Sequence, residues 1–386
     1  MKSNSQDNVV YLIDSRGVIT PDNIDSQQRH IKYAYELGQR SPRNRFIVIT
    51  SSKNSNLTNF ENNFSQYFVK CNNRFSLFYI LRAVQIISKS RRHNSILIAG
   101  DPWESAITSR VISKILKKCF GIYAPLQVQI HADVMDPTWK NATVINRVRY
   151  LSLARNLNKS EQLRVVSESL KKEIVSKKLV QAERVIVSPV ELNLPNKQIQ
   201  VFSDRRPRSI GFAGRFHKDR GISDFVDYVR RINPEKNDVN VILAGEGPLL
   251  KNLIAELNGL MNPTRVKYCG NLSSDEMLKF WREVGVYLSL AKSESYGRSI
   301  REAAYLGIPV LGAKSNGFYE LLKADVSWVC EVESLENSEA LLNQLNCLLS
   351  IKTDYSVQKY LETQSKINLN ILIDSWIKLL GIEQNQ

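Results

Sequence analysis

Short apolar runs alternate with longer amphipathic stretches along the chain, and this alternation constrains the fold more than any other feature. The apolar runs of the first half are residues 9–13, 46–50, 95–100, 126–131, 163–167 and 184–188. Those of the second half are residues 209–214, 239–245, 265–270, 285–290 and 309–313. Helical stretches such as 74–90, 104–119, 222–232 and 248–258 lie between them. Buried strands separated by helices predict an α/β fold with parallel sheets.

The pattern occurs in both halves, so a chain of 386 residues is expected to form two doubly wound domains. Residues 191–209 are polar, contain Pro195 and Pro207 and lack periodicity, which indicates the boundary. We therefore predict domains over 1–200 and 201–386. Residues 359–380 are expected to form one or two helices that pack back toward the first domain. Sheets of this kind bind ligands at the carboxyl ends of their strands, which predicts a cleft between the domains.

Composition excludes several classes of protein. Apolar residues make up 43% and charged residues 24%, a globular balance. The apolar runs are much shorter than the ~20 residues of a membrane span. The polar N-terminus, residues 1–8, lacks the apolar core of a signal peptide. The five cysteines include no pair at CxxC spacing, so a disulfide scaffold and a zinc finger are not expected, and a reducing cytoplasm fits best.

Charge is distributed unevenly. The chain has 53 Lys and Arg against 38 Asp and Glu, a net charge of +15. Residues 1–205 contain 31 basic and 16 acidic residues, whereas residues 206–386 contain 22 of each. The basic first half favours an acidic partner, such as an anionic membrane, a nucleic acid or an anionic substrate. A solvated Lys-rich surface is the alternative.

The segment 293–312, SESYGRSIREAAYLGIPVLG, has the clearest set of candidate site residues. It follows an apolar run and is expected to open a helix, whose unpaired N–H groups can hold a phosphate or sugar hydroxyls. Glu294 precedes this helix, and Glu302 lies about two turns into it, where a carboxylate can accept from a diol. Taken alone, the pair is also explained by a capping Glu294 and a surface Glu302.

This segment resembles the E-x7-E signature of the retaining family 4 glycosyltransferases, which belong to glycosyltransferase group 1 and have the GT-B fold. Three further landmarks of that family are present in order: SIGFAGRFHKDRGISDFV at 209–226, LAGEGP at 243–248 and VKYCGNLSSDEM at 266–277. The resemblance is specific over 208–330 and general over the first half. It implies two Rossmann-like domains facing a central cleft, the first binding an acceptor and the second a nucleotide sugar.

The resemblance also implies roles for residues of the second half. Arg215 and Arg220 would pair with the donor diphosphate, for which the planar guanidinium is suited, and Lys218 is a substitute because the family usually has Lys at Arg220. Glu302 would bind the ribose hydroxyls, and Glu294 would contact the donor sugar. The remaining donor contacts would come from Ser295, Tyr296 and Gly297, and those to the base from Gly270, Asn271 and Leu272.

The first half contributes a smaller set. LQVQIHADVMDP at 126–137 resembles the family's strand-end His segment, which implies that His131 contacts the donor sugar or stabilises the transition state. Asp133 and Asp136 would orient the acceptor hydroxyl, or they act as turn and helix-cap residues. Gly17 stands where the family has a glycine-rich loop of two adjacent glycines, with Arg16 beside it. Gly17 therefore has two possible roles: it contacts the donor phosphates, or it only forms a β-turn.

The implied reaction is transfer of a hexose from a nucleoside-diphosphate sugar to a saccharide or lipid-linked saccharide, with retention and without a dedicated general base. Bacterial surface-polysaccharide synthesis in the cytoplasm is the expected setting. Two cations and a helix N-terminus would stabilise the leaving diphosphate. DNID at 22–25 and DVMD at 133–136 do not have DxD spacing. No metal and no cofactor beyond the donor sugar nucleotide are therefore expected.

Residues 109–121, SRVISKILKKCFG, are the best candidate for a membrane-facing helix. Val111, Ile115 and Cys119 share one face, with Ile112 and Leu116 beside it, and four basic residues occupy much of the rest. Such a helix can lie on an anionic bilayer, and KSRRH at 89–93 adds charge. A sheet-packed helix with a solvated basic face explains the same pattern, and the two interpretations are compatible.

The sequence leaves three alternative functions open. A GT-B-like sugar-nucleotide epimerase would share the donor pocket and need no acceptor. A basic nucleic-acid-binding protein would fit the charge, but no recognition helix or aromatic platform is present, so no nucleic acid partner is expected. An inactive relative that only binds its ligand is the third.

Overall fold

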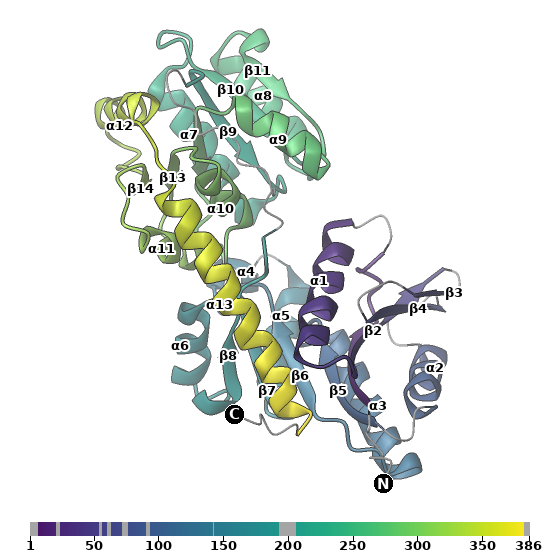
Figure 1. The fold of residues 1–386 in the computed structure, drawn as a ribbon. Coiled ribbons are helices and arrows are strands. Elements are labelled where there is room, and N and C mark those ends of the chain that lie inside the picture. Colours follow the sequence, from purple (N-terminus) through teal and green to yellow (C-terminus); the bar gives the residue numbers. More distant parts are fainter. Residues whose placement is uncertain are drawn as a thin grey trace. The chain divides into compact units, whose positions relative to one another are not determined.

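The structure is a computed structural model that describes residues 7–20, 24–53, 56–59, 63–71, 76–89, 93–141, 143–192 and 206–381. The chain forms two compact units (Figure 1). Unit 1 comprises Met1–Met135, Val144–Asn193 and Lys366–Gln386, and unit 2 comprises Asp136–Thr143 and Leu194–Ser365. Of the segments discussed above, residues 1–6, 21–23, 90–92 and 193–205 lie outside the described residues.

Unit 1 contains an eight-stranded sheet in the order β3-β4-β2-β1-β5-β6-β7-β8. The parallel strands other than β4 are buried apolar runs, as the sequence predicts, whereas β4 was not predicted although it pairs in parallel with β2. The edge strand β3, which pairs antiparallel with β4, was not predicted either. The strand bounds are β1 Asp7–Asp14, β2 Asn44–Ser52, β3 Asn56–Asn59, β4 Phe64–Lys70, β5 His93–Ala99, β6 Leu126–Ile130, β7 Gln162–Val165 and β8 Val185–Val187.

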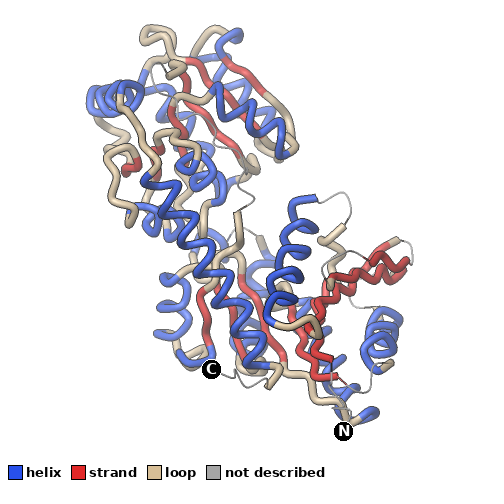
Figure 2. The backbone as a smooth tube through the Cα atoms, in the orientation of Figure 1, coloured by secondary structure: helices blue, strands red, loops and turns tan. Residues whose placement is uncertain are grey.

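Helices connect these strands and cover the sheet of unit 1 (Figure 2). They are α1 Ile24–Arg40, α2 Leu77–Ser88, α3 Glu104–Phe120, α5 Val144–Leu157 and α6 Glu168–Ser176. A short η1 turn, Ala182–Arg184, precedes β8. The chain crosses from β1 to β2 in one direction along the sheet and from β4 to β8 in the other. By the rule that such crossovers are right-handed, this order puts α1 on one face of the sheet and α2, α3 and α5 on the other.

The C-terminal helix α13, Ser356–Leu379, begins in unit 2 and ends in unit 1. Its last turns bury Trp376 against Tyr33 of α1 and Phe46 of β2, with ring centroids 5.8 and 5.4 Å apart. The part of α13 from residue 366 on therefore belongs to unit 1 and contributes to its apolar core, although the sequence analysis assigned it to the second domain with the helices packing back.

Unit 2 contains a six-stranded sheet in the order β11-β10-β9-β12-β13-β14, and every pairing in it is parallel. The apolar runs of the second half form five of these strands. The strand bounds are β9 Ser209–Ala213, β10 Asn240–Ala244, β11 Val266–Tyr268, β12 Val286–Ser289, β13 Val310–Gly312 and β14 Val329–Glu331.

The helices of unit 2 follow from local sequence signals. Ile222, Phe225, Val226, Val229 and Ile232 recur at helical spacing, and this buried stripe of α7 packs into the core. Ser273 and Glu276 form a capping box at the start of α9, as their sequence predicts. The helix bounds are α4 Pro137–Asn141, α7 Ile222–Ile232, α8 Leu250–Leu260, α9 Ser274–Glu283, α10 Arg298–Tyr305, α11 Asn316–Leu322 and α12 Ser338–Ser350, with turns η2 Lys218–Arg220 and η3 Pro263–Arg265.

Each sheet has a point where its strand order reverses. In unit 2 the chain runs from β9 outward to β11 and then returns to β12, which lies directly beside β9. In unit 1 the corresponding neighbours are β1 and β5. Ligands of doubly wound sheets bind at the carboxyl ends of such neighbouring strands. The predicted α/β class with two Rossmann-like sheets is confirmed, and these two points are where a site is expected.

Candidate active site

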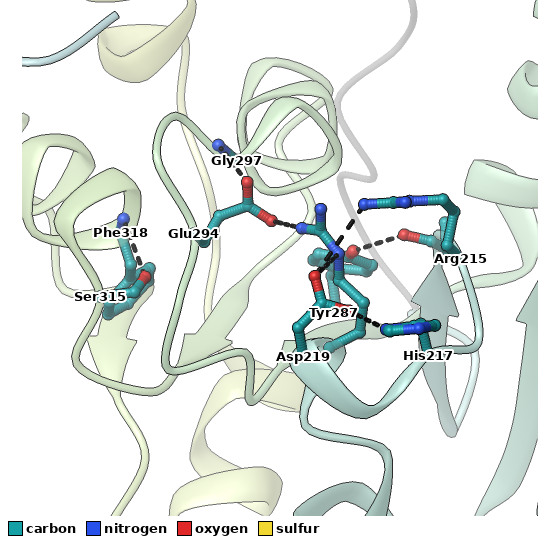
Figure 3. A network of polar contacts seen from close by, with 10 residues as sticks. Arg215, His217, Asp219, Tyr287, Glu294, Gly297, Ser315 and Phe318 are labelled. Carbon is teal, nitrogen blue, oxygen red and sulfur yellow. Dashed lines mark hydrogen bonds and ion pairs between the residues drawn. The ribbon is translucent and has the colours of Figure 1, made fainter. Parts of the chain in front are cut away.

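The loops after β9 and β12 meet at the strand-order reversal of unit 2. Arg220, in the loop after β9, forms an ion pair with Glu294, in the loop after β12. The other oxygen of Glu294 accepts from the backbone N–H of Gly297 at 3.2 Å, where α10 begins. Figure 3 shows this carboxylate between its two partners. The structure therefore brings together three residues predicted for the donor site, and Glu294 also has the turn-stabilising role considered as its alternative.

Arg215 approaches the same place from the β9 side. Its side chain is 70% exposed, and its Nη2 lies 3.9 Å from Oδ2 of Asp219. In Figure 3, Arg215 and Glu294 point toward each other from opposite sides of the network. Asp219 also accepts from Nδ1 of His217 at 2.6 Å. The guanidinium groups of Arg215 and Arg220 thus both lie beside Asp219. With the exposed Lys218, this loop has a net positive charge.

A glycine fixes the position of this loop. Gly221 has φ +65°, and a Cβ atom there would lie 2.2 Å from the carbonyl oxygen of Leu290 at the end of β12. Any side chain at Gly221 would push the Arg220 loop away from the Glu294 loop. Arg220 and Glu294 can therefore meet because Gly221, which has no side chain, lets the backbones of the two loops pack directly against each other.

Helix α10 carries Glu302 in its second turn. Oε1 of Glu302 accepts from Nη2 of Arg298 at 3.2 Å, the i,i+4 pair expected on one helical face. Beneath the site, the hydroxyl of Tyr287 donates to the carbonyl oxygen of Ala213 at 3.0 Å. Burial raises the pKa of Tyr287, and the negative charges of Glu294 and Glu302 raise it further. Tyr287 therefore remains a neutral hydroxyl that ties β12 to β9 below both glutamates.

Tyr296 and its neighbours show contacts that the sequence did not reveal. The buried guanidinium of Arg301 stacks on the Tyr296 ring at 4.0 Å and donates to the carbonyl oxygen of Gly317 at 3.0 Å. The backbone N–H of Gly317 in turn donates to the carbonyl oxygen of Glu294 at 2.6 Å. Arg301 and Gly317 thus hold the loop that carries Glu294, Ser295 and Tyr296. The Ser-Asn-Gly sequence after β13 is the signal that could have indicated this.

The predicted base-binding loop is built on glycine backbone contacts. Gly270 has φ +78°, and its carbonyl oxygen accepts from the N–H of Gly245 at 2.7 Å. Asn271 is exposed, whereas Leu272 packs against the core of unit 2. The hydroxyl of Tyr268 donates to the carbonyl oxygen of Gly245 at 3.0 Å. Gly270 and Asn271 thus remain at the edge of the site, while Leu272 has a packing role.

In unit 1, Gly17 lies in the loop after β1. It has φ +66°, its N–H donates to the carbonyl oxygen of Asp14 at 3.3 Å, and a Cβ atom would lie 2.5 Å from the Ser51 carbonyl oxygen. The buried Asp14 carboxylate accepts from the N–H groups of Val18 and Ile19 at 3.1 and 2.8 Å. Burial raises the pKa of this carboxyl. The fold alone therefore requires a glycine at position 17, which supports the β-turn interpretation without addressing a ligand contact.

His131 follows β6 and joins a polar chain along one face of that strand. Its Nε2 lies 3.1 Å from Oε1 of Gln129, which also accepts from Nη1 of the buried Arg164 at 3.4 Å. An amide oxygen only accepts, so Nε2 carries the proton and Nδ1 acts as an acceptor. Desolvation and the positive charges of Arg164 and Arg29 hold the pKa of His131 well below its usual range, although part of the residue is exposed. The imidazole is therefore neutral at pH 7.

This polar chain continues to the C-terminal helix. Gln129 donates to Oε1 of Gln127 at 3.3 Å, and Gln127 accepts from the indole N–H of Trp376 at 3.0 Å. Asp133 is buried near His131, and Asp136 accepts from the N–H of Trp139 at 3.4 Å at the start of α4. Asp136 thus has the helix-cap role considered for it.

The structure also answers two questions about binding groups. Among the residues that it describes, no cluster of three or more His, Cys, Asp or Glu side chains is placed to hold a metal ion. Within the same residues, no helix combines the length and apolarity that crossing a bilayer requires. In α3, Ile112 and Leu116 are buried in the core, and Lys114, Lys117 and Lys118 are exposed.

Two Rossmann-like units, with a cationic loop and two glutamates at the strand-order reversal of the second, define a protein of the GT-B class. Residues 195–364 match the family model of the glycosyl transferases group 1. This match lies in the second half of the chain and confirms the resemblance seen there in the sequence.

Curated relatives support the same grouping. The chain is 24% identical over 191 residues to the phosphatidylinositol N-acetylglucosaminyltransferase gpi3 subunit of Schizosaccharomyces pombe, covering 49% of this chain and 40% of that protein. It is 22% identical over 250 residues to the N-acetyl-alpha-D-glucosaminyl L-malate synthase of Bacillus anthracis, covering 59% of this chain and 60% of that protein. The chain thus spans less than two thirds of the length of these relatives.

Solved structures match over nearly the whole chain. HepE of Anabaena in complex with UDP-glucose superposes with a TM-score of 0.66 at 16% identity, covering 96% of this chain and 99% of that one. An α,α-trehalose-phosphate synthase (UDP-forming) of Burkholderia vietnamiensis superposes with a TM-score of 0.68 at 9% identity, covering 98% and 99%. At these identities the likeness shows the fold.

Proposed function

We propose that this protein is a glycosyltransferase that moves a sugar from a nucleoside-diphosphate sugar to a saccharide or lipid-linked saccharide acceptor. The observation that carries the proposal is the meeting of Arg220, Glu294 and the start of α10 at the strand-order reversal of unit 2. The structure of HepE with UDP-glucose, a protein of the same fold, supports a nucleotide-sugar donor. Its structure with UDP and glucose supports the same class of ligand.

The donor diphosphate would lie against Arg215 and Arg220. Planar guanidinium groups grip phosphate oxygens in pairs, and the exposed Arg215 can move toward an anion without losing a buried contact. The buried Nε of Arg220 lies 3.7 Å from Oδ2 of Asp219, beyond hydrogen-bond distance, so its N–H would be available to a phosphate oxygen. Lys218, which is also exposed, would add charge to the same loop.

The rest of the donor would follow the loop into α10. Glu302 would accept hydrogen bonds from the ribose hydroxyls, and Glu294 would contact the sugar. Backbone N–H groups at Ser295, Tyr296 and Gly297 and in the first turn of α10 would face the phosphates. Gly270 and Asn271 would border the base, with the packed Leu272 positioning their loop. This arrangement stabilises the negative charge that develops on the departing diphosphate, the largest electrostatic demand of the reaction.

The acceptor would bind to unit 1, at the ends of β1 and β6. His131 would contact the donor sugar, and Gln129 would hold its ring in place. Asp133 would orient the attacking hydroxyl, and Gly17 would allow a close approach at the end of β1. Retention would follow from attack on the face that the diphosphate leaves, with the leaving phosphate taking the proton.

We further propose that the reaction needs neither metal nor cofactor, because two arginines and the N–H groups of α10 would supply the positive charge that a metal would otherwise provide for the diphosphate. The proposed setting is bacterial surface-polysaccharide synthesis at the cytoplasmic face of the membrane, with residues 109–121 on the lipid side.

A donor-turnover assay tests this proposal. Purified protein is incubated with UDP-, GDP- and ADP-sugars, with and without saccharide acceptors and chelator, and nucleoside diphosphate and glycoside are quantified. Formation of an α- or β-glycoside that keeps the donor's anomeric configuration, undiminished by chelator, is expected. Release of an isomerised free sugar without acceptor would instead identify an epimerase, and donor binding without turnover would identify an inactive relative.

A further inference from the structure

Helix α5 exposes a stripe of large apolar side chains. Val144, Val148 and Leu151 are 74%, 62% and 80% exposed and lie at i, i+4 and i+7, on one face of the helix. Ile145, 64% exposed, widens this stripe. The opposite face packs into unit 1 through the buried Leu153 and Leu157. Core packing of α5 therefore leaves its outer face apolar, which is unusual for a helix that faces water alone.

The stripe is part of a wider face on unit 1. Helix α3 packs against α2, and its Arg110 donates to the side chain of Asn156 in α5 at 2.9 Å. All three helices lie on the side of the sheet opposite α1. We call their exposed apolar side chains the docking face; they are Leu77, Phe78, Leu81, Val111, Phe120, Val144, Ile145, Val148 and Leu151.

Positive charge surrounds this docking face. Residues 71–160 contain fourteen Lys and Arg and four Asp and Glu, a net charge of +10. Three of those acidic residues, Asp101, Glu104 and Asp133, are buried. Helices α2 and α5 contain no acidic residue. The exposed basic residues on the three helices include Arg82, Lys114, Lys117, Lys118, Arg147 and Arg155.

We propose that unit 1 docks on an anionic lipid bilayer through the docking face, with the apolar side chains entering the interface and the basic side chains contacting the headgroups. The apolar residues match the acyl-chain boundary of a membrane, and the flanking Lys and Arg match its anionic headgroups. A second copy of this chain would bring two cationic faces together, which opposes self-association. A nucleic acid would match the positive charge, but its phosphate backbone would not cover the apolar stripe of α5.

The inference rests on the proposed function only for its consequence, which is that a lipid-linked acceptor would be reached at the surface where it resides. It also extends the membrane segment expected from the sequence. That expectation concerned α3, whereas the most exposed apolar residues lie on α5.

Vesicle flotation with the full chain tests the proposal. Wild-type protein is expected to float with phosphatidylcholine vesicles that contain anionic phosphatidylglycerol, and not with phosphatidylcholine alone. A triple variant, Lys114→Gln/Lys117→Gln/Lys118→Gln, should weaken binding about a hundredfold, since each basic residue near the surface contributes about fivefold. The variant Val148→Ser/Leu151→Ser should weaken it about tenfold or more.

Matched controls remove the same groups elsewhere. Lys251→Gln/Lys279→Gln/Lys323→Gln removes three exposed lysines of unit 2, and Tyr35→Ser removes an exposed aromatic residue of α1. Both controls should bind anionic vesicles as the wild type does. Equal melting curves for all the variants would show that their fold is intact.

Three results would overturn the docking proposal. They are no flotation with anionic vesicles, flotation that neither docking-face variant reduces, and a wild-type dimer in light scattering that Val148→Ser/Leu151→Ser converts to a monomer. Thermal stabilisation by nucleoside diphosphates is measured in parallel. If the diphosphates do not stabilise the protein but it floats with anionic vesicles, the proposed function is contradicted and membrane docking is supported. If they stabilise it but it does not float, membrane docking is contradicted and the proposed function is supported.

Discussion

The guanidinium of Arg220 pairs with the carboxylate of Glu294, although 74 positions separate them in the chain. The two residues come from the loops after β9 and β12, which are neighbours in the sheet. Their side chains are 23% and 18% exposed, so the pair is partly screened from water. The Glu294 carboxylate thus pairs with the arginine that we assign to the donor diphosphate. The diphosphate must therefore compete with Glu294 for Arg220.

Removing the charge of Glu294 should therefore strengthen binding of a bare nucleoside diphosphate. We expect Glu294→Gln to bind it about two- to fivefold more tightly, the range of a partly exposed ion pair. The same variant should slow sugar transfer, since the contact with the sugar is lost. Titration calorimetry with the diphosphate and a donor-turnover assay measure the two effects.

Arg220→Gln is the matched partner of that variant. It should weaken diphosphate binding about tenfold or more, because hydrogen bonds to a charged group contribute about 1.5–3 kcal/mol. Tighter binding by Arg220→Gln, or weaker binding of the bare diphosphate by Glu294→Gln, would contradict the assignment of Arg220 to the phosphates.

Gly221 should tolerate no side chain. Gly221→Ala is expected to lower the free energy of unfolding of unit 2 by about 3 kcal/mol or more, since it adds backbone strain at positive φ to an overlap with the Leu290 carbonyl. Gly259 in α8 has open space around its Cα, so Gly259→Ala should raise that free energy by about 0.5–1 kcal/mol. Chemical denaturation measures both. Similar effects at the two glycines would show that the Arg220 loop is not packed as described.

Trp376 should stabilise unit 1 through its hydrogen bond to Gln127. Trp376→Phe removes the indole N–H and part of a fully buried side chain, which should cost about 2 kcal/mol. Hydrogen exchange of the β6 amides is the measurement, and it should accelerate in the variant. Thermal stabilisation by nucleoside diphosphate, which we assign to unit 2, should be retained. Unchanged β6 exchange would contradict a supporting role of the C-terminal helix.

Acid should destabilise unit 1 through His30. Burial and the nearby Arg29 lower the pKa of His30 to about 3, below about 6.5 in the unfolded chain. The unfolded chain therefore binds a proton below pH 6.5 that the folded chain excludes, and stability falls as the pH falls toward 3. From pH 7 to 5 this amounts to about 2 kcal/mol.

His30→Gln should flatten this dependence on pH. His217→Gln is the control, because the His217 imidazole is 36% exposed and lies beside the carboxylate of Asp219. This variant should keep the wild-type dependence on pH. Urea denaturation between pH 5 and 7 measures the slopes. An equal slope in wild type and His30→Gln would show that His30 is not neutral in the folded state.

The sequence predicted most of the fold because buried parallel strands are nearly continuous apolar runs. Two of the strands it missed, β3 and β14, are short and lie at sheet edges. The third, β4, is longer, but polar residues interrupt its apolar ones. Helix α5 was missed because its apolar residues lie on both faces, buried at Leu153 and exposed at Leu151, so no single apolar stripe is visible.

The candidate site was predictable where motifs carry it, as for Arg220, Glu294 and Glu302. Arg301 and Gly317 could not be found in the same way. Arg301 acts on Tyr296 through a buried stacking contact, and Gly317 through a backbone hydrogen bond from another loop. Likewise, the chain from His131 to Trp376 joins residues that only the packing of α13 on unit 1 brings together.

Glu302 gives the most direct test of the donor site in unit 2. Melting curves are recorded with UDP, GDP and ADP for wild type, Glu302→Ala and Glu256→Ala, an exposed carboxylate of α8. A ligand at ~100 times its dissociation constant adds about 2.7 kcal/mol. We predict that one diphosphate stabilises wild type and Glu256→Ala by this amount and that Glu302→Ala loses most of the shift. No shift with any of the three, or an equal shift in Glu302→Ala, would contradict the proposed site.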